Sequence, residues 1–156
     1  MVEKRYELMS PYFVHQLLKK DLGNDKMWCG CVKGKDFTVV EKVFTPFNWD
    51  GKHWVVVETD LVHRLFRVYN SLKLSRMVSS VHHLCVRLPH LCRAIKCSHA
   101  VCESGNMEPW IAEAVDDVPQ QEGSGDCGVM VAAFVEALMC DVPLMCDGSL
   151  LCGCGV

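Results

Sequence analysis

Cys127 stands where a glycine-rich loop meets a long apolar segment. The loop "EGSGD" (122–126) precedes "CGVMVAAFVEALMC" (127–140), a pattern that predicts a helix with the thiol in its first turn. Asp126 is a suitable N-cap. The N–H groups of a first helical turn favour the thiolate, which is the nucleophilic form of cysteine. Cys127 is therefore either a reactive thiol or a structural cysteine, because free Cys also packs as a small hydrophobe.

A nucleophilic cysteine needs a base, and His53 is the strongest candidate because it begins a strand. The segments "KHWVVVETD" (52–60) and "RLFRVYNSL" (64–72) predict a β-hairpin. If His53 and Asn70 are opposite one another, the hairpin is centred between 61 and 62, and the two Cβ atoms are about 5 Å apart. Asn70 would then orient one ring nitrogen and leave the other for the thiol. The alternative is that Asn70 only starts a turn.

Gln121 precedes Cys127 by six residues, across the glycine-rich loop. Its amide and the backbone N–H of Cys127 could form an oxyanion hole, in which hydrogen-bond donors hold the negative oxygen of a tetrahedral intermediate. The alternative is that "PQQE" is ordinary surface.

The remaining elements predict an α+β fold in one domain, with strands in the middle and a central helix after them. The apolar helix at 127–140 is expected to be buried on nearly every face. The other expected elements are a helix at 10–23 capped by Ser10 and ended by Gly23, a strand at 36–49 that stops at Pro46, a helix at 74–88 stopped by Pro89, and a short strand within 109–119.

Charge is unevenly distributed along the 156 residues. Residues 1–96 hold all 16 Lys and Arg against 9 acidic residues, whereas residues 97–156 hold 10 acidic residues and no Lys or Arg. The two halves either neutralise each other within one fold or give a partner groove one basic wall. No long basic run supports nucleic-acid binding. No apolar stretch is long enough to span a membrane, and the N-terminus lacks the pattern of a signal peptide.

Eleven cysteines, an odd number without a signal peptide, indicate a reduced intracellular protein rather than a disulfide scaffold. Two clusters leave a zinc-stabilised, nucleic-acid-associated domain as an alternative: "CGC" (29–31) and "HHLCVRLPHLCRAIKCSHAVC" (82–102). Neither has the paired C-x-x-C spacing of a structural zinc site, so no metal or other cofactor is expected.

Together, "HWVVVETDLVHRLFRVYNSL" and "PQQEGSGDCGVMV" resemble the Ulp/SENP-type SUMO proteases, most closely the plant and transposon-associated members. The resemblance covers residues 38–142, within a single domain of residues 1–156. It implies a papain-like or adenain-like cysteine protease fold, with a central mixed or antiparallel sheet and a buried helix that carries the nucleophile. The order His, Asn, Cys differs from that of the papain line, in which Cys comes first.

Carried over to this sequence, the resemblance implies Cys127 as nucleophile, His53 as general base and Gln121 as oxyanion donor. Trp54 would line a tunnel that only a Gly-Gly tail is slim enough to enter. The expected activity is cleavage after the Gly-Gly terminus of a ubiquitin-like protein such as SUMO, and family habit suggests the nucleus. Asn70 stands where the family usually has Asp. That difference, and ends shorter than usual, leave a second reading: a module that binds the tail without cutting it.

Overall fold

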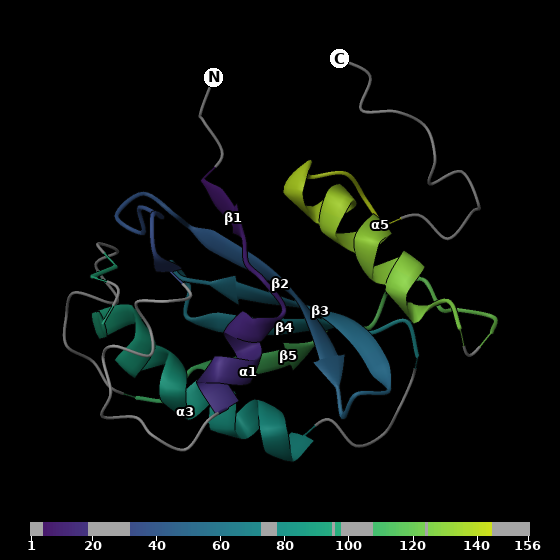
Figure 1. Ribbon diagram of the computed structural model, residues 1–156, viewed down its shortest axis with the longest axis horizontal. Coiled ribbons are helices and arrows are strands. Elements are labelled where there is room, and N and C mark those ends of the chain that lie inside the picture. The colour runs from purple at the N-terminus through teal and green to yellow at the C-terminus, as the bar shows by residue number, and fades with distance from the viewer. Residues whose placement is uncertain are drawn as a thin grey trace.

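Five strands form one mixed sheet in the computed structural model, which describes residues 5–18, 32–72, 78–94, 96–97, 108–123 and 125–144 (Figure 1). The strands lie in chain order and are β1 (Tyr6–Leu8), β2 (Lys42–Trp49), β3 (His53–Asp60), β4 (Leu65–Tyr69) and β5 (Ile111–Ala114). The three central strands are antiparallel, and each outer strand is parallel to its neighbour. The expected α+β fold with a mixed sheet is confirmed.

Helices cover both faces of the sheet. Helices α1 (Tyr12–Leu18) and α3 (Val78–Ala94) lie on one side, and α5 (Cys127–Met139) lies on the other (Figure 1). Neighbouring side chains of a strand point to opposite faces. Val55 and Val57 therefore join the core under α1 and α3, whereas Val56 joins the core under α5. This double burial explains why β3 has an almost continuous apolar run.

The first helix begins as expected. The hydroxyl of Ser10 accepts a hydrogen bond from the backbone N–H of Tyr12 (3.3 Å), and its carbonyl accepts one from that of Phe13 (2.9 Å). Ser10 therefore satisfies N–H groups that a helix start leaves without internal partners. The expected end at Gly23 lies outside the described residues.

Strand β2 does not stop at Pro46, so that expectation was wrong. The strand continues to Trp49, and Pro46 pairs with Val56 of β3. Strand β1 pairs with β2 only as far as Phe44. Beyond that point β2 is an edge strand on its outer side, where a missing N–H is tolerated.

Helix α3 does not stop at Pro89 either. In an uninterrupted helix, residue 89 would donate its N–H to the carbonyl of Cys85, which proline cannot do. The backbone N–H of Trp110, which directly precedes β5, donates to that carbonyl instead (3.0 Å). A distant segment thus supplies the hydrogen bond that the proline removes, and the helix runs on to Ala94.

Strands β3 and β4 form the expected hairpin, but with a different register. Val56 pairs with Tyr69 and Asp60 pairs with Leu65, so continuation of the ladder places Asn70 opposite Val55 and not His53. The expected direct opposition was wrong by two residues. A shift of two leaves each side chain on its original face, because the side-chain period of a strand is two.

Helix α5 is confirmed where the sequence predicts it, but its predicted burial on nearly every face is wrong. Its buried residues, Cys127, Val131, Phe134 and Ala137, form one stripe that packs on β2 and β3. Val129, on the opposite face, is 73% exposed. The helix therefore lies on the sheet as a covering layer and not inside a core.

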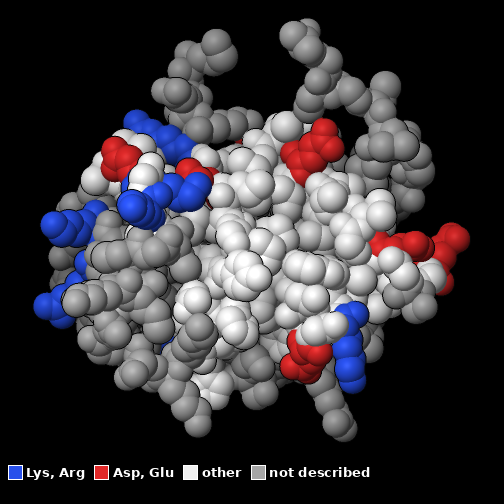
Figure 2. Space-filling view, in the orientation of Figure 1, with Lys and Arg blue, Asp and Glu red and all other residues white. Residues whose placement is uncertain are grey.

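On the face shown in Figure 2, most of the visible Lys and Arg side chains lie at the left, with Asp and Glu side chains among them, and further acidic side chains lie at the right edge. The middle of this face is largely uncharged. No helix among the described residues has both the length and the apolar character needed to cross a membrane.

Candidate active site

His53 is held at the tip of the hairpin that joins β2 to β3. Asp50 and Gly51 both have positive φ (51° and 68°), and the N–H of Lys52 donates to the carbonyl of Trp49 (3.0 Å). An Asp-Gly pair in this conformation forms a tight turn matched to the twist of antiparallel strands. The first residue after that turn is His53, which is 8% exposed.

The imidazole of His53 reaches Asn70, the first residue after β4. The distance from His53 Nε2 to Asn70 Oδ1 is 2.7 Å. Because the two residues are offset by two positions in the ladder, this is a diagonal contact between neighbouring strands. The structure therefore brings together the predicted base and its predicted partner, but through a diagonal contact and not through direct opposition.

The contacts of Asn70 define the hydrogen positions on the imidazole. Asn70 Oδ1 also accepts the backbone N–H of Leu72 (2.9 Å), which identifies this atom as the oxygen of the amide. An amide oxygen only accepts, so His53 Nε2 must carry a hydrogen and donate. In the neutral ring, Nδ1 then keeps the lone pair and is the basic nitrogen. Asn70 thus both starts a turn and fixes the tautomer of His53.

Cys127 is the first residue of α5 and is 8% exposed. The backbone of Asp126 occupies the N-cap position, and its carbonyl accepts the N–H of Met130 (3.0 Å). Its carboxylate makes no capping hydrogen bond, and Oδ2 lies 3.4 Å from where a Cβ on Gly123 would sit. The first-turn N–H groups are therefore not used by the Asp126 side chain, and helix geometry leaves them able to bind an anion.

The sulfur and the imidazole are not hydrogen-bonded to each other. Among the described residues, His53 has its side-chain hydrogen bond with Asn70, and none joins it to Cys127. Helix α5 packs against β3, whose first residue is His53. Hydrogen bonds of catalytic groups are often formed or shortened only when substrate binds.

Gln121 is held in place on three sides. Its backbone N–H donates to the carbonyl of Ser71 (2.9 Å), and its side-chain Oε1 accepts the hydroxyl of Ser71 (2.7 Å). Its side-chain Nε2 donates to the carbonyl of Gly123, inside the loop that leads to Cys127. Gln121 is thus an ordered part of this loop, tied to the end of β4.

Trp54 is half-buried and packs against the core cluster between the sheet and α5. It pairs with Asn48 of β2. Its role as a tunnel wall stays a prediction.

Ser71 and Gln120 belong to the same assembly, and sequence reasoning missed both. Ser71 is 1% exposed, and Gln120 Nε2 donates to the carbonyl of Asn70 (3.1 Å). No signal in the sequence marked them, because "NSL" and "PQQ" are typical of turns and surfaces.

Other cysteines of the described chain differ from Cys127 in position. Cys85, Cys92 and Cys97 are buried, and Cys140 at the far end of α5 is exposed. Burial raises the pKa of the Cys85 thiol to about 11, so this thiol is unreactive at neutral pH.

The zinc alternative receives no support from the part of the chain that the structure describes. There, no group of three or more His, Cys, Asp or Glu side chains comes together as metal ligands. The "CGC" cluster at 29–31 and several residues of the second cluster lie outside the described ranges.

The chain is similar in fold to solved SUMO proteases. A structure of SUMO protease Ulp1 with its catalytic cysteine oxidised to a sulfonic acid matches with TM-score 0.70 and 20% identity, over 94% of this chain and 63% of that one. The C-terminal Ulp1 protease domain in complex with Smt3, the yeast orthologue of SUMO, matches with TM-score 0.63 and 21% identity, over 90% and 59%. The Ulp1-like SUMO protease catalytic domain of Chaetomium thermophilum matches with TM-score 0.57 and 16% identity, over 90% and 53%.

The chain spans less than two thirds of the length of these solved relatives. No protein of curated function matches it. A family model described as the Ulp1 protease family, C-terminal catalytic domain, matches residues 1–149. With the fold, the sheet-borne His53–Asn70 pair and Cys127 at a helix start, this match shows that the chain belongs to the Ulp1 protease family.

Proposed function

We propose that this protein is a cysteine peptidase that cleaves after the Gly-Gly terminus of a SUMO-like protein, through Cys127, His53 and Asn70. The single observation that carries the proposal is the His53–Asn70 hydrogen bond, which leaves Nδ1 of His53 as the base. Membership of the Ulp1 protease family supports a catalytic role for this base, because cysteine peptidases need a thiol that is activated by an imidazole.

The proposed reaction has two stages. His53 Nδ1 takes the thiol proton, and the sulfur of Cys127 attacks the carbonyl carbon of the last glycine. The C–N bond then breaks as the imidazolium returns its proton to the leaving amine. Water, deprotonated by the same imidazole, attacks the thioester and releases the carboxylate and the thiol. Asn70 keeps the imidazole in one tautomer through both stages.

The oxyanion of each tetrahedral intermediate is assigned to two donors. One is the backbone N–H of Cys127, at the start of α5. The other is the side-chain amide of Gln121. One of its two N–H groups is used by the carbonyl of Gly123, and the other is assigned to the oxyanion.

Substrate choice rests on family likeness and on Trp54. The solved complex of the Ulp1 protease domain with Smt3 supports a SUMO-like protein as the partner. Trp54 directly follows His53 in β3 and packs on the face of the sheet that α5 covers, and α5 begins with Cys127, so an aromatic wall there would lie close to the scissile bond. Glycine is the residue that fits a narrow channel beside such a ring.

The proposal is tested with a SUMO-like protein that ends in a Gly-Gly vinyl electrophile. The wild-type chain should form a covalent adduct at Cys127, identified by peptide mapping. The Cys127→Ser variant should form none, whereas Cys140→Ser should react like the wild type, because Cys140 lies at the opposite end of the same helix. Absence of an adduct with the folded wild-type chain would contradict the proposal.

A binding module without turnover is the second candidate, and Asn70 favours it. A neutral amide orients the imidazole but lacks the negative charge that would stabilise imidazolium. Tight but non-covalent binding of the same electrophilic protein would support this candidate, whereas covalent capture followed by hydrolysis of the natural terminus supports the peptidase.

A further inference from the structure

Two segments are joined by hydrogen bonds beside the candidate site: the end of β4 and the loop before α5. The N–H of Gln121 donates to the carbonyl of Ser71 (2.9 Å), and Gln120 Nε2 donates to the carbonyl of Asn70 (3.1 Å). The hydroxyl of Ser71 adds a third bond, to Oε1 of Gln121 (2.7 Å). The segment that orients His53 is therefore fixed to the segment that carries the assigned oxyanion donor.

The hydroxyl of Ser71 and the carbonyl of Gly123 hold the two ends of the Gln121 amide. The amide Nε2 donates to the carbonyl of Gly123, which can only accept, so the opposite atom is the oxygen. That oxygen receives the O–H of Ser71, which is 1% exposed and has little room to move. With Oε1 and one N–H both engaged, the direction of the second N–H is fixed.

We infer that Ser71 is a positioning residue: its hydroxyl holds the Gln121 amide so that the second N–H points where the oxyanion develops. This inference rests on the proposed function. Ser71 acts through Gln121 and touches no reacting atom. Donors that stabilise an oxyanion are effective because they are oriented before the reaction begins. Removal of the hydroxyl lets the amide rotate, and the donor must then be reoriented during the reaction.

The test is a double-mutant cycle of Ser71→Ala and Gln121→Ala, with Ser71→Thr as the conservative variant. Two quantities are measured: kcat on a SUMO-like protein with a C-terminal Gly-Gly amide, and the affinity for the same protein ending in an aldehyde. The thiol adds to the aldehyde carbon, and the proton of sulfur ends on the former carbonyl oxygen. That oxygen occupies the oxyanion position, so the probe reports on the donors without turnover.

Ser71→Ala should lower kcat and aldehyde affinity about five- to tenfold, the effect of one neutral hydrogen bond, with little change in KM. Ser71→Thr should restore most of the loss. In the Gln121→Ala background, Ser71→Ala should change neither quantity, because residues that act as one unit are not additive. Alkylation of Cys127 by iodoacetamide should keep its wild-type rate in Ser71→Ala, since the His53–Asn70 pair is left intact.

The outcomes separate the inference from the proposed function. If Gln121→Ala weakens the aldehyde complex but Ser71→Ala does not, the inference is wrong and the oxyanion assignment stands. The inference is also overturned if the Ser71→Ala loss persists without Gln121, or if alkylation of Cys127 slows, because Ser71 would then act through Asn70 or through the fold. If the wild-type chain binds no aldehyde at all, both the proposed function and the inference are wrong.

Discussion

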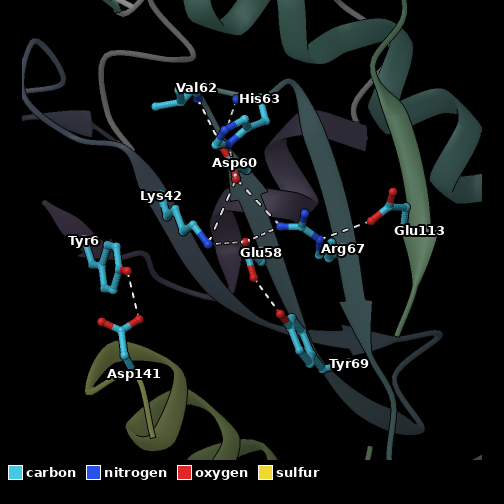
Figure 3. A network of polar contacts seen from close by, with 10 residues as sticks. All are labelled: Tyr6, Lys42, Glu58, Asp60, Val62, His63, Arg67, Tyr69, Glu113 and Asp141. Atoms are coloured by element: carbon cyan, nitrogen blue, oxygen red, sulfur yellow. Dashed lines mark hydrogen bonds and ion pairs between the residues drawn. The ribbon is translucent and has the colours of Figure 1, made fainter. Parts of the chain in front are cut away.

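The hairpin of β3 and β4 carries a polar cluster at each end, and the two clusters differ in how completely their groups are paired. At the closed end, Glu58 is 2% exposed and accepts hydrogen bonds from Arg67 (2.8 Å) and Tyr69 (2.6 Å), with Lys42 3.0 Å away (Figure 3). At the open end, Asn70 satisfies one nitrogen of His53 and the second nitrogen keeps a lone pair.

Asp60, also at the closed end, has several hydrogen-bond donors around its carboxylate. The carboxylate of Asp60 accepts the backbone N–H groups of Val62 (3.1 Å) and His63 (2.9 Å) and contacts the ring of His63 (3.0 Å). Arg67 continues the network to Glu113 of β5 (3.1 Å) (Figure 3). The cluster therefore links four strands, β2 to β5, and gives the buried carboxylates of Glu58 and Asp60 several hydrogen-bond or ion-pair partners each.

The comparison separates polar groups that stabilise a fold from those that can do chemistry. Buried charges are tolerated when each has partners, as at Glu58. A base must instead keep a lone pair for the substrate, and an oxyanion donor must keep an N–H group for it. Two histidines of one hairpin each contact a partner through one ring nitrogen, but the His63 side chain is 67% exposed and contacts the carboxylate of Asp60, whereas His53 is buried and contacts the amide of Asn70.

The largest expected effect is loss of activity at the open end. His53→Ala should lower the rate of peptide-bond cleavage by about 10³–10⁴-fold, because the thiol loses its base. His63→Ala is the matched control and should keep the wild-type rate. Both are measured by single-turnover cleavage of a SUMO-like precursor. Equal cleavage rates for the two variants would show that the open end has no greater role in catalysis than the closed end.

Next in size is loss of stability at the closed end. Glu58→Gln should lower the free energy of unfolding by about 3 kcal/mol, because it leaves Arg67 and Lys42 without their buried carboxylate. Urea unfolding followed by circular dichroism measures the change. Cleavage by the fraction that remains folded should be unchanged. A variant that is as stable as the wild type would show that the network contributes specificity of packing and not stability.

A smaller effect is expected from Asn70→Asp, which adds a charge beside His53 without changing the shape of the side chain. The carboxylate stabilises imidazolium, so the rate at which the Cys127 thiolate attacks an electrophile should rise about tenfold. Alkylation of Cys127 by the vinyl-terminated probe is followed at neutral pH, with Asn70→Ala as the control that removes the orienting oxygen. A lower rate in Asn70→Asp than in the wild type would mean that the neutral amide is required.

The smallest effect concerns the pH dependence of stability. Burial acts to raise the pKa of the Asp60 carboxyl, but hydrogen bonds from His63 and the charges of His63 and Lys42 outweigh it, so the pKa lies below its ordinary value of 3.8. A depressed pKa in the folded state contributes stability above the unfolded-state pKa, and that stability is lost as the pH falls through the folded-state value.

Asp60→Asn should therefore cost about 1 kcal/mol at pH 7. The difference from the wild type should shrink once the pH falls below 3.8. Unfolding midpoints measured from pH 7 to pH 2 test this, and a difference that stays constant over the range would contradict it.

Local patterns in the sequence predicted most of the fold. The apolar run after Gly125 predicted α5, and the Val-rich segments predicted β3 and β4. The two prolines were misjudged for a physical reason. Pro46 is tolerated because β1 ends early, and Pro89 because Trp110 supplies a distant N–H. Neither compensation can be read from the residues around the proline.

The sequence predicted that His53 and Asn70 lie together, but not the register that brings them together. His53 and Asn70 were paired on the assumption of direct opposition, whereas the ladder places them diagonally. The error did not separate them, because a shift of two keeps the same face. Ser71 could not be predicted, since its role depends on a loop 50 residues away in sequence.

The most direct test of the central claim is a crystal structure of the covalent adduct between this chain and a vinyl-terminated SUMO-like protein. The account predicts a bond to the sulfur of Cys127, His53 Nδ1 within about 4 Å of that sulfur, and Nε2 still on Oδ1 of Asn70. An adduct on another cysteine, or an imidazole turned away from the sulfur while Asn70 binds elsewhere, would contradict it.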